Sequence, residues 1–143
     1  MNLVRNIITI DGPGGVGKGT LAFSLAEKLN WNVLDSGLIY RLIGYLSLEG
    51  RLETEQEIIQ FLNKSKIQLL TNFKEGICEI ELNGKVLAEE LRNENIASRA
   101  SEIAKEAEIR KAIIKIQRNA YDPKKGLIAD GRDMGTMIFP EAA

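Results

Sequence analysis

The chain has 143 residues, which is enough for one domain with a hydrophobic core, and its apolar and charged fractions of 44% and 27% are ordinary for a globular protein. The formal net charge of −1 disfavours DNA or RNA as a partner, because nucleic-acid binders usually carry a basic surplus. The sequence has no histidine and one cysteine, Cys78, which excludes Ser-His-Asp triads, His-ligated zinc and an intrachain disulfide.

The N-terminal region does not read as a targeting segment. Its apolar stretch, residues 7–10, is too short for the core of a signal peptide and is followed at once by Asp11-Gly12. No run approaches the roughly 18 apolar residues of a membrane helix. We therefore expect a cytoplasmic protein with no membrane partner, and we interpret Cys78 as a small buried hydrophobe in a reducing compartment.

The first predicted elements form a strand–helix–strand unit. A strand is predicted over residues 6–10, where a β-branched apolar run is closed by Asp-Gly-Pro-Gly-Gly. A helix is predicted over residues 18–29, with Leu21, Leu25 and Leu29 on one stripe, and a second short strand over residues 31–34. Two strands joined through a helix indicate a parallel sheet.

Two further helices follow in the sequence. After Asp35-Ser36-Gly37, apolar residues recur at helical spacing at Ile39, Leu42, Ile43 and Leu46. Thr54-x-x-Glu57 is a capping-box pattern, which predicts the start of another helix that runs through Leu62.

The pattern then changes to short strands. Residues 67–70 and 77–82 are predicted strands, and Asn83-Gly84 is the strongest short hairpin signal. This predicts a small antiparallel subdomain of about residues 63–91, inserted into a core formed by residues 1–62 and 92–143.

The last part returns to helix and strand. Residues 94–120 are helical in character, with the clearest apolar face at Ile109, Ala112, Ile113 and Ile116, and residues 127–131 are a third predicted core strand. The expected fold class is α/β, with a three-layer α/β/α arrangement around a parallel sheet.

A phosphate-binding motif lies between the first strand and the first helix. Residues 12–18, GPGGVGK, match G-x-x-x-x-G-K in the structural context that this motif requires. Glycines let backbone N–H groups turn toward phosphates, the helix N-terminus adds positive potential, and Lys18 supplies a point charge for the β- and γ-phosphates. We predict that a nucleoside triphosphate binds Gly12, Pro13, Gly14, Gly15, Val16, Gly17, Lys18, Gly19 and Thr20.

The motif departs from its strict form after the lysine. Ser or Thr normally follows the lysine and reaches Mg²⁺, whereas here Gly19 follows and the hydroxyl of Thr20 is shifted by one residue. Mg²⁺ is expected with the nucleotide, but a role for Thr20 as its ligand stays open. Asp130, at the end of the third strand, is either a turn residue or an acid facing the Mg²⁺-bound phosphates.

Two longer motifs narrow the family. The ending GKGT, the segment LDSGLIYR over residues 34–41 and the segment IADGRDMGTMIFP over residues 128–140 together resemble bacterial cytidylate kinases, and the resemblance runs along the whole chain. It implies a P-loop fold with an enlarged monophosphate-binding region. It also implies transfer of the γ-phosphoryl group of ATP to CMP or dCMP, a reaction that depends on positioning and charge stabilisation.

The resemblance also implies roles for single residues. Arg41 of the YR pair and Arg132 of DGRD would hold the CMP phosphate, which suits the forked guanidinium group. Asp133 would accept a hydrogen bond from the cytosine amino group, which uracil lacks. Lys18 and Arg132 would be the catalytic residues. Ser36 and Tyr40 would line the nucleoside pocket, and Ser101 and Arg110 would help to read the base.

Plainer interpretations stay open for several of these residues. Asp35 or Ser36 could be a helix N-cap, Arg41 a solvated helix residue, and Arg132 and Asp133 a pair within a turn. Ser101 and Arg110 are nine residues apart, which places them on opposite faces of one straight helix. They can read one base only if the helix breaks between them, yet the intervening sequence lacks the proline that the family usually has there.

The chain ends at Ala143, just after the third core strand, whereas the resemblance implies a further strand and an arginine-rich lid beyond this point. We therefore expect a C-terminally incomplete kinase with exposed apolar sheet surface, whose turnover and oligomeric state stay open. Two alternatives remain: a nucleotide-binding module without turnover, or a P-loop kinase for another small acceptor.

Overall fold

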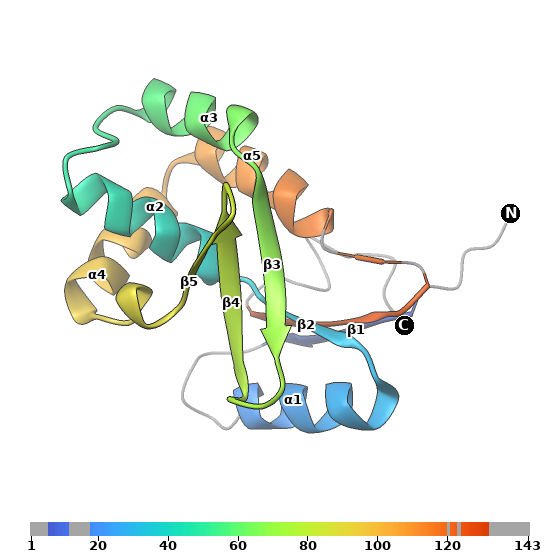
Figure 1. The fold of residues 1–143 in the computed structure, drawn as a ribbon. Helices are drawn as coiled ribbons and strands as arrows, with labels where there is room; N and C mark the ends of the chain where they lie inside the picture. Colours follow the sequence, from blue (N-terminus) through green and yellow to red (C-terminus); the bar gives the residue numbers. More distant parts are fainter. Residues whose placement is uncertain (1–5, 12–17, 120, 123, 132–143) are drawn as a thin grey trace, which may run out of the picture. The chain divides into compact units, whose positions relative to one another are not determined.

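The structure, a computed structural model, describes residues 6–11, 18–119, 121–122 and 124–131, and for residue 11 and residues 18–20 it describes the backbone (Figure 1). The fold is mixed α/β, with one parallel and one antiparallel sheet, which confirms the predicted class. The described residues fall into two compact units, each treated by itself below. The first takes those within Met1–Ser36, Leu69–Cys78 and Gln117–Ala143, and the second those within Gly37–Gln68 and Glu79–Ile116.

The first unit contains the parallel sheet. Its strands are β1 (Ile7–Asp11), β2 (Asn32–Asp35) and β6 (Leu127–Gly131), in the order β1-β6-β2. Both neighbours pair with β6 in parallel. The third predicted strand is therefore the central one of the three. Its residues Leu127, Ile128 and Ala129 are almost completely buried, as expected for a strand covered on both faces.

Helix α1 (Lys18–Leu29) follows β1 with the predicted bounds, but it buries a different face from the leucine stripe. Leu21 and Leu29 are 50% and 42% exposed, whereas Ala22 and Ala26 are completely buried. The helix packs against β6 and β2, and these small side chains let its backbone approach the sheet closely. The predicted buried face of α1 is therefore wrong, because the buried positions are each one residue after the predicted Leu21 and Leu25.

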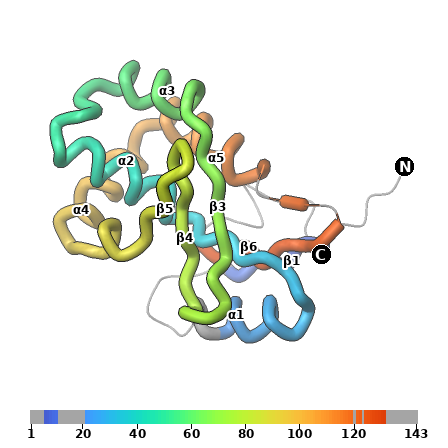
Figure 2. The backbone as a smooth tube through the Cα atoms, in the orientation of Figure 1, coloured from blue at the N-terminus to red at the C-terminus, as the bar shows by residue number. Residues whose placement is uncertain are grey.

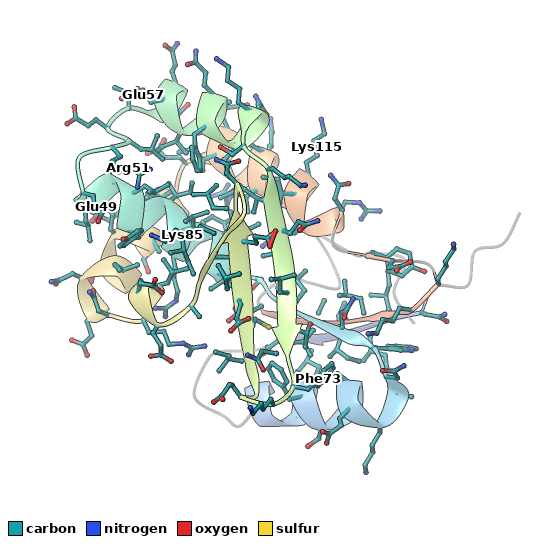
Figure 3. All side chains as sticks on the ribbon, in the orientation of Figure 1. Glu49, Arg51, Glu57, Phe73, Lys85 and Lys115 are labelled. Atoms are coloured by element: carbon teal, nitrogen blue, oxygen red, sulfur yellow. The ribbon has the colours of Figure 1, made fainter. Side chains whose placement is uncertain are left out.

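Backbone groups of Val33 in β2 form hydrogen bonds with side chains of β3 and β4. The Val33 N–H donates to Thr71 Oγ1 at 2.9 Å, and the Thr71 hydroxyl donates to the Val33 carbonyl at 3.3 Å. The buried Cys78 thiol donates to the same carbonyl at 3.6 Å, which confirms its structural role. Phe73 packs edge to face on Phe23 of α1, with ring centroids 6.2 Å apart (Figure 3).

The small sheet has the order β3-β4-β5, and β3 (Ile67–Asn72) and β4 (Ile77–Leu82) run in opposite directions (Figure 1). β4 pairs antiparallel with β5 (Lys85–Leu87). The linking residues Asn83 and Gly84 have φ values of 50° and 92°, the left-handed conformations that a two-residue hairpin needs. The predicted hairpin is confirmed, while the boundaries of the insert, about residues 63–91, stay a prediction.

The second unit is largely helical. Its helices α2 (Leu38–Leu48) and α4 (Glu94–Ile103) lie side by side (Figure 2). Gly44 allows this approach, since an added Cβ there would lie 3.0 Å from the Ile96 carbonyl oxygen. The predicted apolar face of α2 is buried, at Ile39, Leu42, Ile43 and Leu46.

The predicted capping box opens α3 (Glu55–Lys64). Thr54 Oγ1 accepts from the Glu57 N–H at 3.1 Å, and the Glu57 carboxylate accepts from the Thr54 N–H at 2.9 Å. Both interactions satisfy N–H groups that a helix start leaves without intrahelical partners.

The predicted helix over residues 94–120 is not continuous. The short helix η1 (Glu89–Leu91) precedes α4, which ends at Ile103. Three residues, 104–106, then separate α4 from α5 (Ala107–Arg118). The N–H groups of Lys105 and Glu106 bond three residues back, which tightens the chain out of the α-helix. Ile109 and Ile113 are buried as predicted.

Candidate functional site

The glycine-rich motif lies between the end of β1 at Asp11 and the start of α1 at Lys18. Lys18, Gly19 and Thr20 form the first turn of α1, whereas residues 12–17 lie outside the described residues. The predicted strand before the motif and the predicted helix after it are therefore both present. The N-terminus of α1 offers backbone N–H groups and the positive end of the helix dipole to an anion.

The carboxyl edge of the parallel sheet carries two acidic residues. Asp35 and Asp130 are register partners at the ends of β2 and β6, with Asp35 exposed and Asp130 half-buried. Open parallel sheets bind ligands outside this edge. Arg132 and Asp133, which follow β6 directly, lie outside the described residues.

Ser36 is held by its backbone on both sides. Its N–H donates to the Asp130 carbonyl oxygen at 3.0 Å, and its carbonyl oxygen accepts from Gln117 Nε2 at 2.7 Å. Gly37 occupies the N-cap position of α2, so the interpretation of Asp35 or Ser36 as that cap is wrong.

In the second unit, Tyr40 and Arg41 lie in the first turn of α2. Arg41 is half-buried, and its Nη1 donates to the Leu91 carbonyl oxygen of η1 at 3.2 Å. This contradicts the interpretation of Arg41 as a solvated helix residue. A guanidinium group has five N–H donors, so one bond to Leu91 leaves donors that suit a phosphate.

Tyr40 and Arg110 interact electrostatically. Burial raises the pKa of the half-buried Tyr40 phenol, and the positive charge of Arg110 partly opposes this rise. Arg110 is exposed on α5, whereas Ser101 lies on α4. Because the helix breaks between them, the two residues do not lie on one straight helix.

Arg110 also helps to form the break on which its predicted role depends. Its Nη1 donates to the Ala104 carbonyl oxygen, at the end of α4, at 2.9 Å, while its own N–H begins α5 by bonding Glu106. The helix thus breaks without a proline. Ser101 is exposed on α4, and no hydrogen bond of the described residues joins it to Arg110.

Sequence analysis missed Gln117. It is 1% exposed in the last turn of α5, where its amide bonds Ser36. One signal was available, because Gln117 follows Ile109 and Ile113 at four-residue spacing and so places an amide on the apolar face of this helix.

Among the described residues, no group of three His, Cys, Asp or Glu side chains could hold a metal ion. Likewise, the described helices include none that is long and apolar enough to cross a membrane.

The site defines the class of P-loop nucleotide-binding proteins. Its features are a strand, the sequence GPGGVGKGT, a helix, and an acidic residue at the carboxyl edge of a parallel sheet.

Comparison with known proteins gives the family within this class. The chain belongs to the cytidylate kinase family, whose model matches residues 8–143. It is 42% identical over 136 residues to a cytidylate kinase of Pasteurella multocida, covering 95% of this chain and 60% of the relative. It is 41% identical to a cytidylate kinase of Klebsiella pneumoniae, covering 95% of this chain and 60% of the relative. It is 39% identical over 142 residues to a cytidylate kinase of Sodalis glossinidius, covering 99% of this chain and 62% of the relative. The chain therefore spans about 60% of the length of these relatives.

Proposed function

We propose that this chain contributes the nucleotide sites of an enzyme that transfers the γ-phosphoryl group of ATP to CMP or dCMP. A phosphate oxygen of the monophosphate would attack the γ-phosphorus, the bond to the β–γ bridging oxygen would break, and ADP would leave. The products would be ADP and CDP or dCDP, within pyrimidine nucleotide metabolism. The observation that carries this proposal is membership of the cytidylate kinase family over residues 8–143.

For the ATP end, we assign residues 12–20. The backbone of this loop and the first turn of α1 would cradle the phosphates, and Lys18 would neutralise charge on the β- and γ-phosphates. Arg132 would add charge at the transferring group, so Lys18 and Arg132 are the proposed catalytic residues. The position of Lys18 at the start of α1 supports this assignment.

Mg²⁺ would accompany the ATP in this proposal. Mg²⁺ prefers oxygen ligands and is usually held by one or two carboxylates together with substrate phosphates, so it does not need a dedicated protein cage. The half-buried Asp130 at the carboxyl edge of β6 suits such a role, with Thr20 as the second candidate. The ion would shield phosphate charge during transfer.

For the CMP end, Arg41 and Arg132 would hold the phosphate, and Asp133 would accept from the cytosine amino group. The half-buried guanidinium of Arg41 and its contact with Leu91 support a fixed position for this group. The nearness of Arg110 to Tyr40 supports their assignment to one nucleoside pocket. The remaining assigned residues are Ser36 and Ser101, and the insert of about residues 63–91 would belong to this end.

The proposal includes a cytoplasmic location and no nucleic-acid partner. The single, buried cysteine, Cys78, supports the first point, and the net charge of −1 supports the second.

Calorimetric titration of the chain with single nucleotides tests the proposed substrates. We expect CMP and dCMP to bind more tightly than UMP and AMP, and ATP to bind independently of either. Asp133→Asn should reduce the preference for CMP over UMP, since an amide presents a donor as well as an acceptor. Equal binding of CMP, UMP and AMP would contradict the assignment and favour another small acceptor.

A further inference from the structure

The end of α5 contains a buried amide that the proposed reaction does not use. Gln117 is 1% exposed, and it is the one polar residue that is buried among the described residues. Its Nε2 donates to the Ser36 carbonyl oxygen at 2.7 Å, whereas its Oε1 has no hydrogen-bond partner among the described residues. An unpaired buried acceptor is destabilising. An apolar residue would avoid this penalty, so the amide contributes mainly through its contact with Ser36.

The contact fixes a turn rather than a side chain. The Ser36 carbonyl oxygen is held by Gln117, and the Ser36 N–H is held by the Asp130 carbonyl oxygen at 3.0 Å. Both bonds involve backbone groups of Ser36, so they fix the backbone position from which its side chain projects. A hydrogen bond within a protein interior is electrostatically stronger than one in water.

We propose that Gln117 is a positioning residue that fixes Ser36 for contact with the nucleoside monophosphate. This inference rests on the proposed function, because it takes Ser36 as part of the CMP site. Gln117 itself does not have to touch the substrate. It acts through the Ser36 carbonyl oxygen, while the Ser36 N–H is bonded to the Asp130 carbonyl oxygen of β6.

Gln117→Met tests the proposal in the chain as it exists. Methionine has a similar length. Losing the Nε2 donor costs the bond to Ser36, but losing the unpaired Oε1 removes a penalty, so the midpoint of thermal unfolding should change little. Hydrogen exchange of the Ser36 amide in the nucleotide-free chain should become faster. CMP binding should weaken about three- to tenfold, the loss expected for one net hydrogen bond, while ATP binding stays the same.

A double-mutant cycle separates positioning from a general structural role. In a Ser36→Ala background, Gln117→Met should weaken CMP binding much less than it does in the unmodified chain, because the hydroxyl that it positions is gone. Gln60→Met is the matched control, since Gln60 is exposed on α3, and it should change neither binding nor exchange.

Several outcomes would overturn the proposal. Unchanged exchange of the Ser36 amide in Gln117→Met would show that the contact does not hold the turn. Equal weakening of CMP and ATP binding, with a lower unfolding midpoint, would show a merely structural role. If the unmodified chain binds no CMP, the proposed function fails, and the exchange measurement still decides whether Gln117 fixes Ser36.

Discussion

Arg41 is a residue whose environment suits phosphate binding. Its half-buried guanidinium is anchored on the Leu91 carbonyl oxygen, so little side-chain freedom is left to lose when a ligand binds. Arg41→Lys keeps the charge but loses the planar fork. We expect CMP binding to weaken by about 1.5–3 kcal/mol, the range for hydrogen bonds to charged groups, while ATP binding is unchanged.

Calorimetry of Arg41→Lys with CMP and with ATP checks this prediction. Arg92→Lys is the control, because Arg92 is exposed just after η1 and should tolerate the change. An unchanged affinity of Arg41→Lys for CMP would remove Arg41 from the proposed site.

The Tyr40–Arg110 pair gives a test that needs no ligand. A nearby positive charge favours the phenolate, so Arg110 lowers the pKa of Tyr40 against the effect of burial. In Arg110→Ala the pKa of Tyr40 should therefore rise further above its ordinary value. Titration of the Tyr40 ring signals by NMR measures this, with Lys111→Ala on the same helix as the control. A pKa of Tyr40 that stays the same in Arg110→Ala would mean that the two side chains are not neighbours in solution.

At the scale of elements, the capping box of α3 makes acid stability depend on Glu57. Backbone N–H groups of Thr54 and Glu53 bond this carboxylate and hold its pKa below the usual range. A lowered carboxyl pKa adds stability above the unfolded pKa, near 4.3, and the contribution is lost as the pH falls through the folded value.

Glu57→Gln should thus flatten the acid side of the stability profile without changing the rest of its shape. Thermal unfolding between pH about 2 and 7 measures this, and Glu27→Gln, at an exposed position of α1, serves as the control. The account of the capping box is wrong if both variants lose stability with falling pH as steeply as the unmodified chain.

The Thr71 hydroxyl should stabilise the fold through its hydrogen bonds to β2. This hydroxyl accepts from the Val33 N–H and donates to the Val33 carbonyl oxygen. Thr71→Val keeps the shape but leaves the N–H without its partner, and we expect the free energy of unfolding to fall by about 1–3 kcal/mol. Urea unfolding measures the change, and Thr71→Ser, which keeps the hydroxyl, should lose clearly less. Equal losses in both variants would show that packing of the methyl group, and not the hydroxyl, matters.

At the scale of the whole molecule, elements with strong local signals were predicted well. The capping box at Thr54 and the hairpin at Asn83-Gly84 depend on interactions between residues close in sequence. The bounds of α1 and β6 were marked by local sequence, a glycine-rich segment before α1 and a short apolar run ending in Asp-Gly for β6. The phosphate motif was identified for the same reason, since it needs only a strand, its own glycines and a helix.

Features that depend on distant contacts were not predicted. The place of β6 between β1 and β2, and the alanine face of α1, are set by packing on the sheet. The break after Ile103 is stabilised by Arg110 and the Ala104 carbonyl oxygen, without a proline to signal it. The partners of Arg41 and Gln117 are backbone carbonyls far away in sequence, and no pattern of side-chain types reveals them.

The central claim of the proposed function is that this chain transfers the γ-phosphoryl group of ATP to CMP or dCMP. A coupled assay of ADP release measures it most directly, using the chain with Mg-ATP and each of CMP, dCMP, UMP and AMP, and Lys18→Ala as the control. We predict ADP release with CMP and dCMP that is lost in Lys18→Ala, because the lysine stabilises the transferring phosphoryl charge. A folded chain that binds ATP but releases no ADP with any of the four acceptors would contradict the claim for this chain and leave a nucleotide-binding module without turnover.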